Sequence, residues 1–252
     1  DKLVAVARTW NDGLLDVLTD GWGAEDGKRL FTVYSTAFSA AYHETFTPRQ
    51  AQIDIEKIEA MTAAGDLALN MYRPIVAAEH TVRFKIYHAG ASLALSDCLP
   101  MLENLGLRVV EERPYKIGRG ENLVDVWLHD LLLVDAKETS LDIRAIGQRF
   151  QETFARLWSG EVENDGFNRL VLRAGLTWRE VVILRAYAKY LRQAGVAFSQ
   201  AYIEETLADY PAIAADLVLT ERSEVTQLIA TVEELLVDSP KPSPSEAPDA
   251  RG

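Results

Sequence analysis

The chain has 252 residues, of which 48% are hydrophobic and 25% are charged, a composition that is ordinary for a soluble globular protein. Its net charge of -12 argues against nucleic acid and anionic membrane surfaces as general partners. The single cysteine, Cys98, excludes an internal disulfide and a thiolate metal cage, and no apolar run approaches the roughly 20 residues that a membrane span requires.

The N-terminal part of the chain has the pattern of a helical segment. Apolar residues recur at helical spacing from Leu3 to Leu18, and the glycines within residues 21–23 interrupt that helix. A second helix is expected to place the apolar residues between Leu30 and Ala41 on one face. Residues 47–50 (TPRQ) predict a third helix start, because threonine and glutamine can close a capping box and proline fits the first helical position.

The middle of the chain alternates strands with helices. Val82, Phe84 and Ile86 alternate with polar side chains, which is the period-two pattern of a half-buried strand. Two further strands are predicted at residues 107–111 and 123–134, with a glycine-containing loop between them. The order strand, helix, strand, strand is a β-α-β-β unit of the kind that builds small α+β sandwiches.

Two helices are expected to pack on this sheet. The first contains Pro100, which fits only the first helical turn, so Ser96 or Asp97 is the predicted N-cap. Gly106 is the expected left-handed residue at its C-terminal end. Ser140 is predicted to cap the second helix.

An extra strand is predicted at residues 66–73, ahead of this unit. A hairpin connection would place it antiparallel beside residues 81–87, in the position of the missing last strand of a four-stranded ferredoxin-like sheet. The predicted fold class is α+β, a βαββα sandwich with an antiparallel sheet between N-terminal and C-terminal helical segments. The predicted domains are an N-terminal helical segment (1–63), the α+β domain (64–159), a helical domain (160–237) and a disordered tail (238–252).

The C-terminal part again reads as helical. Residues 177–180 (TWRE) are a second capping box, and the helix that they open is expected to close at Gly195. Apart from one polar stripe this helix is apolar, which predicts burial on most sides. Ser199 and Pro211 are predicted to start two further helices, and residues 225–237 also have a helical pattern. The proline- and serine-rich tail has too little apolar content to form a core.

Four blocks of the sequence resemble the large NAD-specific glutamate dehydrogenases of bacteria. They are residues 95–115 (LSDCLPMLENLGLRVVEERPY), 167–182 (FNRLVLRAGLTWREVV), 185–193 (RAYAKYLRQ) and 198–200 (FSQ). The resemblance extends over roughly residues 1 to 218, and the sequence departs from the family pattern after Leu219. It implies an ACT-type regulatory domain and helical segments that lie upstream of a catalytic domain.

The patterns of catalytic and cofactor sites are missing or misplaced in the sequence. Gly118 and Gly120 begin a formal dinucleotide fingerprint, but they lie between two strands, where a hairpin loop is favoured over a helix that could face a pyrophosphate. The histidines have no pair at i, i+4 spacing, so no metal site is predicted. Cys98 is interpreted as a small core residue. We therefore predict no catalytic, cofactor-binding or metal-binding residue in the chain.

The turn before the first helix of the sandwich is the predicted place for a small effector. Its candidate binding residues are Gly90, Ala91, Ser92, Ser96 and Asp97, because glycine allows close approach of the backbone and a helix start offers free N–H groups to a carboxylate. The resemblance to ACT modules, which bind amino acids beside this turn, implies the same loop. Asp97 would repel a carboxylate, so an ordinary capped turn is the alternative.

A basic run in the C-terminal helices is the second candidate. Arg173, Arg185, Lys189 and Arg192 are predicted to form a docking surface for the catalytic domain of the same polypeptide. A solvated face, or one that is paired with acidic neighbours elsewhere in the protein, is the alternative.

The sequence therefore favours a non-catalytic, regulatory and linking part of a glutamate dehydrogenase. The resemblance implies that the whole enzyme oxidises L-glutamate to 2-oxoglutarate and ammonia with NAD as cofactor, in the cytoplasm and as a homo-oligomer, while this chain alone is inactive. The alternative is a freestanding ACT-type module that binds an amino acid. A ferredoxin-like acylphosphatase is excluded, because that chemistry relies on an arginine in the first strand-to-helix loop and residues 88–97 contain none.

Overall fold

The computed structural model describes residues 8–74, 77–120, 123–195 and 197–220. Its elements follow one another as α2 (Trp10–Trp22), α3 (Ala24–Tyr34), α4 (Ala40–Thr45), α5 (Pro48–Glu59), β1 (Leu67–Tyr72), β2 (Thr81–Ala89), α6 (Leu95–Asn104), β3 (Leu107–Ile117), β4 (Val126–Asp135), α7 (Ile143–Trp158), η1 (Gly166–Arg169), α8 (Leu170–Arg173), α9 (Trp178–Gln193) and α10 (Gln200–Asp209). Residues 211–220 form a further helical stretch. The predictions for residues 1–7, 225–237 and 238–252 lie outside the described residues.

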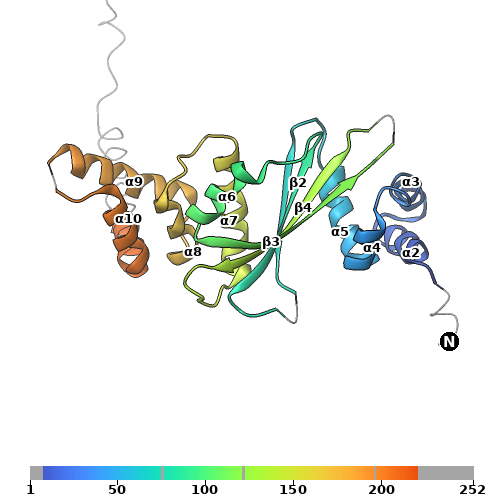
Figure 1. Ribbon diagram of the computed structural model, residues 1–252, viewed down its shortest axis with the longest axis horizontal. Coiled ribbons are helices and arrows are strands. Elements are labelled where there is room, and N and C mark those ends of the chain that lie inside the picture. The colour runs from blue at the N-terminus through green and yellow to red at the C-terminus, as the bar shows by residue number, and fades with distance from the viewer. Residues whose placement is uncertain (1–7, 75–76, 121–122, 196, 221–252) are drawn as a thin grey trace, which may run out of the picture.

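The sheet has four strands in the order β1-β2-β4-β3, and every neighbouring pair is antiparallel. The predicted extra strand is β1, which pairs with β2 so that Leu67 lies opposite His88 and Tyr72 lies opposite Arg83. It occupies the edge that a C-terminal fourth strand would take in a ferredoxin-like sheet, which confirms the predicted fold class. Helical segments lie at both ends of the molecule (Figure 1).

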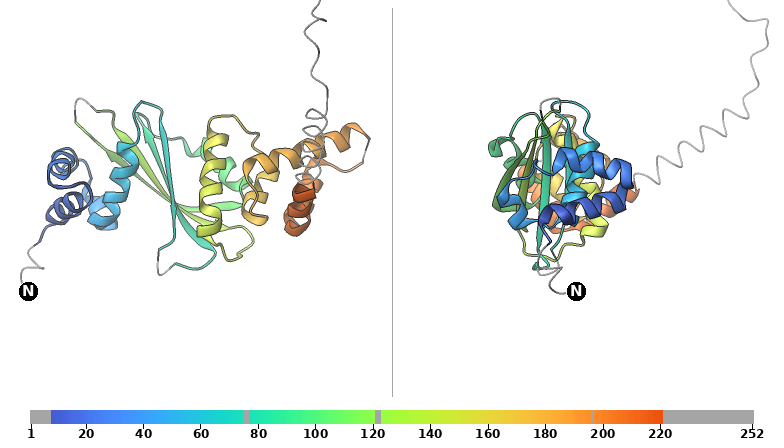
Figure 2. Two further views of the ribbon diagram at one scale, coloured as in Figure 1. Left: turned by 180° about the vertical axis from the view of Figure 1, so that it is seen from behind. Right: turned by 90° about the vertical axis from the view of Figure 1, so that its right-hand side faces the viewer.

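Helices cover both faces of the sheet, and each face has its own core. Helices α6 and α7 lie on one face, where Phe84 packs against Phe150 and Phe154 with ring centroids 5.3 and 5.2 Å apart. Helices α2 to α5 lie on the other face, where Ile55 and Tyr87 belong to a second core. Figure 2 shows the same layers from behind. The prediction of a half-buried strand was therefore wrong, because the N-terminal helices bury the second face of β2.

Both predicted capping boxes are confirmed, and a third, formed by Thr9 and Asp12 at the start of α2, was not predicted. Thr47 with Gln50 and Thr177 with Glu180 each exchange both capping hydrogen bonds at the starts of α5 and α9. Gly106 follows Leu105, the C-cap residue of α6, and has a φ of 92°, in the left-handed region that favours glycine. Local hydrogen bonding thus decides where these helices begin and end.

Three predictions of helix boundaries were wrong. Helix α6 begins at Leu95 after the N-cap Ala94, so Pro100 lies inside the helix and costs it one backbone hydrogen bond. The predicted helix across Leu30 to Ala41 is broken into α3 and α4, because Ser39 accepts a hydrogen bond from the Tyr42 N–H and starts a new helix. Helix α7 is capped by Asp142, not by Ser140. None of the helices in the described parts of the chain has the length and apolar content needed to cross a membrane.

Candidate functional site

The predicted effector turn is tied to the end of the sheet. The Gly90 N–H, at a φ of 96°, donates to the Asp125 carbonyl at 2.8 Å. The Ala91 carbonyl lies 2.7 Å from His88 Nδ1, and Ser92 Oγ lies 3.3 Å from His129 Nε2. Ser96 and Asp97 are in the first turn of α6, where the Ser96 hydroxyl donates to the neighbouring carboxylate at 3.3 Å. The structure brings Gly90, Ala91 and Ser92 together beside this helix start, which has no side-chain cap.

His129 of β4 fixes that turn, a role that no local pattern of residues around it indicates. Its ring is only 3% exposed, and its Nε2 accepts a hydrogen bond from the Leu93 N–H at 3.2 Å. An accepting Nε2 carries no proton, so the proton of the neutral ring lies on Nδ1, which is 2.7 Å from Glu112 Oε1. The buried ring therefore joins the turn to β3 through two hydrogen bonds.

Replacing His129 with leucine is expected to release this turn. The Leu93 N–H and the Glu112 carboxylate both lose their partner, and a buried unsatisfied group costs about 1–3 kcal/mol. We expect a loss of that size in the free energy of urea unfolding, with faster amide exchange in residues 90–95. The matched control is His80→Leu, at a partly exposed position, where a change within about 0.5 kcal/mol is expected. Equal losses in the two variants would contradict this role.

The structure does not bring the four predicted docking residues onto one exposed face. Arg185 is only 3% exposed, and its guanidinium donates to the Asp165 carboxylate at 2.7 and 2.9 Å and to Asn168 Oδ1 at 2.9 Å. Lys189 pairs with Glu163 on the surface at 2.7 Å. Arg192 is exposed near the end of α9. The arginine predicted for the surface thus lies inside, where it pairs with Asp165, the residue that also caps η1.

Arg173, the fourth of these residues, joins the sheet to the C-terminal helices. Its Nη1 lies 2.9 Å from Asp135 Oδ2 at the end of β4 and 2.8 Å from Thr139 Oγ1, and its Nη2 also bonds to Asp135. Burial raises the pKa of Asp135, but hydrogen bonds from Arg173, Thr139 and the Lys137 N–H outweigh it and hold that pKa below its ordinary value. The pair is therefore ionised in the folded protein at neutral pH.

A second buried charge cluster joins the N-terminal helices to the opposite face of the sheet. The Asp54 carboxylate of α5 accepts from Lys85 Nζ of β2 at 2.6 and 2.9 Å, and from the Tyr87 hydroxyl at 2.6 Å. The Tyr42 hydroxyl is its third donor. Burial and the nearby carboxylate raise the pKa of both phenols well above the ordinary value, so both remain donors. The Lys85 ammonium also lies 3.7 Å from the centroid of the Phe46 ring.

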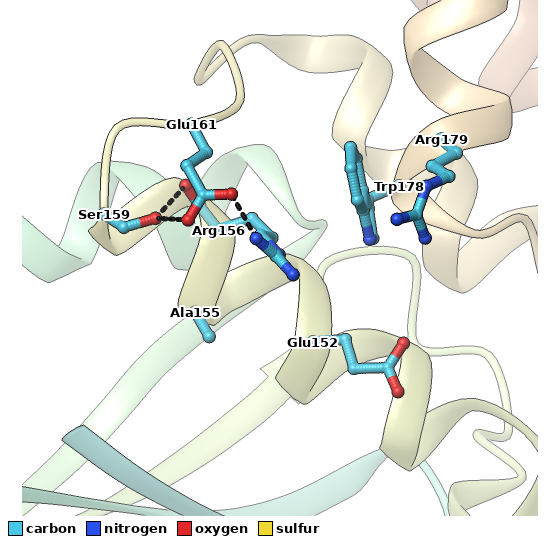
Figure 3. Close-up of a pocket in the computed structure, with 7 residues that line it drawn as sticks. All are labelled: Glu152, Ala155, Arg156, Ser159, Glu161, Trp178 and Arg179. Carbon is cyan, nitrogen blue, oxygen red and sulfur yellow. Dashed lines mark hydrogen bonds and ion pairs between the residues drawn. The ribbon is translucent and has the colours of Figure 1, made fainter.

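A polar hollow of about 490 Å³ lies where the C-terminal half of α7 faces the start of α9 (Figure 3). The Trp178 ring lies beside the guanidinium groups of Arg156 and Arg179, whose central carbons are 5.3 and 4.3 Å from the ring centroid. Arg156 also pairs with Glu161. Two guanidinium groups and the carboxylates of Glu152 and Glu161 line the hollow, so their charges balance and it does not select an anion.

Several apolar side chains of α9, among them Val182, Tyr190 and Leu191, are exposed, contrary to the prediction that this helix is buried on most sides. Two faces of the helix are distinct. The outer face consists of Val182, Ile183, Ala186, Tyr187 and Tyr190, which line an open hollow. The apolar groove lies between α9, α10 and the helical stretch 211–220, and is lined by Leu184, Tyr187, Ala188, Leu191, Ile203, Leu207, Leu217 and Thr220. Tyr190 is 65% exposed and Leu217 is 48% exposed.

In the part of the chain that the structure describes, no group of three or more histidine, cysteine, aspartate or glutamate side chains is arranged to hold a metal ion. Gly118 and Gly120 follow β3 in the connection to β4, as a hairpin loop requires. Cys98 is buried, and its burial raises the pKa of the thiol to about 11, so it is protonated at neutral pH. Among the described residues, the remaining candidates for a functional role are the charged contacts between elements and the exposed apolar faces of α9.

An antiparallel four-stranded sheet with two helices on one face, flanked by helical segments, defines an ACT-like α+β protein. Family comparisons agree segment by segment. Residues 17–61 match helical motif 2 of glutamate dehydrogenase, residues 66–146 match its ACT3 domain, and residues 162–220 match its helical motif 3. The chain therefore carries, in this order, helical motif 2, the ACT3 domain and helical motif 3 of the glutamate dehydrogenase family.

Curated relatives carry the name NAD-specific glutamate dehydrogenase. The chain is 42% identical to the protein of Halomonas elongata over 218 residues, and 37% identical to that of Pseudomonas aeruginosa over 218 residues. It is 37% identical to that of Mycobacterium tuberculosis over 221 residues. Each alignment includes 86% of this chain but only 13% of the relative, so the chain spans a small part of the length of the proteins that it matches.

Proposed function

We propose that the chain is the regulatory and linking part of a NAD-specific glutamate dehydrogenase whose catalytic site lies elsewhere in the polypeptide. The order of helical motif 2, ACT3 domain and helical motif 3 within 13% of the relatives' length carries this proposal. The whole enzyme would convert L-glutamate, NAD and water to 2-oxoglutarate, ammonia and NADH. NAD would be bound by the catalytic part of that enzyme, in the cytoplasm.

The way in which the helical segments are attached to the sheet supports a linking role. The pair of Asp54 and Lys85 holds α5 against one face of the sheet. The pair of Arg173 and Asp135 holds α8 to the end of β4, next to the opposite face. Breaking either buried pair is costly, so the two helical motifs keep fixed positions on the sheet. A domain with both helical motifs fixed on its sheet would set the distance and relative orientation of the protein segments that contact its two ends.

We propose the outer face of α9 as the surface that docks on the catalytic domain. Val182, Ala186 and Tyr190 expose apolar surface there, and contiguous exposed apolar patches mark interaction sites. Lys189 and Arg192 lie on the adjacent side of the same helix and would supply charge at the rim of the interface.

The purified chain is expected to form no NADH from L-glutamate and NAD. Hydride transfer requires groups that hold the cofactor and groups that bind the substrate in one cleft. The side-chain clusters found among the described residues are instead contacts between elements and exposed apolar surfaces. Absorbance at 340 nm measures the reaction, and the whole relative from Pseudomonas aeruginosa is the positive control under identical conditions. Turnover by the chain above its buffer blank, retained after further purification, would overturn the proposal.

The alternative of a freestanding amino-acid-binding module rests on the turn that contains Gly90 and Ser92. There, the side chains of Ser92 and His129 are engaged with each other and with the backbone. We therefore favour the linking role. Calorimetric titration of the chain with a panel of amino acids separates the two, since heat of binding at this turn is expected only for the sensing module.

A further inference from the structure

The buried ring of His129 has two neighbours at the same nitrogen. Its Nε2 lies 3.2 Å from the Leu93 nitrogen and 3.3 Å from Ser92 Oγ. A backbone N–H can only donate a hydrogen bond, whereas a hydroxyl can donate or accept one. The bond to Leu93 therefore requires that Nε2 carry no proton, while the Ser92 hydroxyl can bond to the ring whether or not this nitrogen is protonated.

We propose that protonation of His129 is a switch that releases the turn before α6 (residues 90–94). An imidazolium ring donates from both nitrogens, so it cannot accept from the Leu93 N–H, and its Nε2–H would donate to the Ser92 hydroxyl instead. Leu93 is only 8% exposed, so its N–H is left without an acceptor unless the turn moves toward water. Because a buried unsatisfied donor is costly, the neutral ring holds the turn in place and the cation favours an open turn.

Glu112 of β3 favours the charged form of the ring. Its Oε1 lies 2.7 Å from His129 Nδ1, which donates in both protonation states of the ring. Burial disfavours an imidazolium, but a carboxylate at this distance stabilises it. Protonation thus strengthens the contact with β3 and breaks the contact with the turn, so one proton has opposite effects on the two sides of the ring. Histidine is also the side chain that most often changes its charge near neutral pH.

The other titratable groups around this ring do not act in its place. Strand β2 contributes His88, whose Nδ1 lies 2.7 Å from the Ala91 carbonyl and donates to it in either protonation state, because a carbonyl can only accept. Helix α6 contributes Asp97, which is exposed, and Cys98. Burial, with Glu112 and Asp97 nearby, raises the pKa of the Cys98 thiol to about 11, so the thiol keeps its proton. Among the described residues, α7 places no charged side chain within hydrogen-bond or ion-pair distance of the ring.

A pH titration of the full chain tests the proposal. Nuclear magnetic resonance follows the imidazole signals of His129 from about pH 8 to pH 5, and amide exchange is measured at each pH and corrected for its intrinsic dependence on pH. We expect the protection of Leu93 and its neighbours to fall about tenfold as the ring becomes protonated, because losing a buried hydrogen bond shifts the local opening equilibrium by about this factor. The two curves should share one midpoint, and amides of α9 should be unaffected.

Three variants assign the effect to the ring. His129→Gln replaces the ring with an amide that does not titrate and can still accept from the Leu93 N–H, so protection should no longer depend on pH. Glu112→Gln should move the midpoint of the ring to lower pH, because the cation loses its counter-charge. His88→Gln is the matched control, a second histidine beside the same turn, and should leave both the loss of protection and its midpoint unchanged.

Constant protection of residues 90–94 while the ring titrates would overturn the proposal, and so would a ring that stays neutral down to pH 5. A loss of protection with the same midpoint in His129→Gln would also overturn it, because another group would then control the turn. These results are independent of whether the chain has glutamate dehydrogenase activity, so a failure of the switch is distinct from a failure of the proposed function.

Discussion

Replacing Lys85 with methionine is expected to lower the free energy of unfolding by about 3–5 kcal/mol, the cost of removing one partner from a buried ion pair. Methionine has a similar length, so the cavity that it leaves is small. The loss comes from Asp54, whose carboxylate is fully buried and would keep only the Tyr42 and Tyr87 hydroxyls as donors. The ammonium also leaves the face of the Phe46 ring, and a desolvated contact of this kind contributes up to about 2 kcal/mol.

Urea unfolding followed by circular dichroism measures this effect. The control is Lys116→Met, the same substitution in an exposed pair where Lys116 Nζ lies 2.8 Å from Asp125 and is 55% exposed. Exposed pairs contribute about 0–1 kcal/mol, so the control should change little. Asp54→Leu combined with Lys85→Met removes both charges and should recover much of the loss. A Lys85→Met variant that is as stable as the Lys116→Met variant would contradict the claim that the buried pair of Asp54 and Lys85 stabilises the fold.

This buried pair also shows what the sequence could and could not reveal. The alternation of Val82, Phe84 and Ile86 correctly predicted which side chains of β2 face α6 and α7. It also assigned Lys85 to the solvent side, because alternation cannot tell water from a second layer of helices. The available signal was Asp54, which lies in the apolar stripe of α5 with Ala51, Ile55 and Ile58. A carboxylate within such a stripe implies a buried cation elsewhere, but its partner 31 residues away follows only from the fold.

For helix α9, the predictions of burial that were drawn from its residue types were wrong. Its apolar residues predicted burial and its basic stripe predicted an exposed surface, yet Arg185 is buried while Val182 and Tyr190 are exposed. Burial is decided by what packs against a helix, and the described elements leave part of the apolar surface of α9 uncovered. Arg185 is inside because Asp165 and Asn168 lie there to satisfy it. Capping boxes, in contrast, depend on residues three positions apart, and those at Thr47 and Thr177 were predicted from the sequence.

The second large effect is expected for Arg173→Met, which should loosen the C-terminal helices from the sheet. Asp135 would remain buried but would keep its hydrogen bonds from Thr139 and the Lys137 N–H, so the expected loss is about 2–3 kcal/mol, slightly below that of a fully unpaired buried charge. Amide exchange should increase in α8, α9 and α10 and remain unchanged in α2 to α5. Arg169→Met is the matched control, since this partly exposed arginine directly precedes α8 and the bonds of the pair are made by Arg173, Asp135 and Thr139.

The dependence of this loss on pH follows from the lowered pKa of Asp135. A carboxyl group whose pKa is lower in the folded than in the unfolded state stabilises the protein above its unfolded pKa of about 3.8 and loses that contribution as pH falls through the lowered folded value. The difference in stability between the unmodified chain and Arg173→Met should therefore be constant from about pH 5 to pH 7 and should narrow below about pH 4. Urea unfolding at pH 7, 5, 4 and 3 measures it. A difference that stays constant down to pH 3 would mean that Arg173 stabilises the junction by packing, and not through the charge of Asp135.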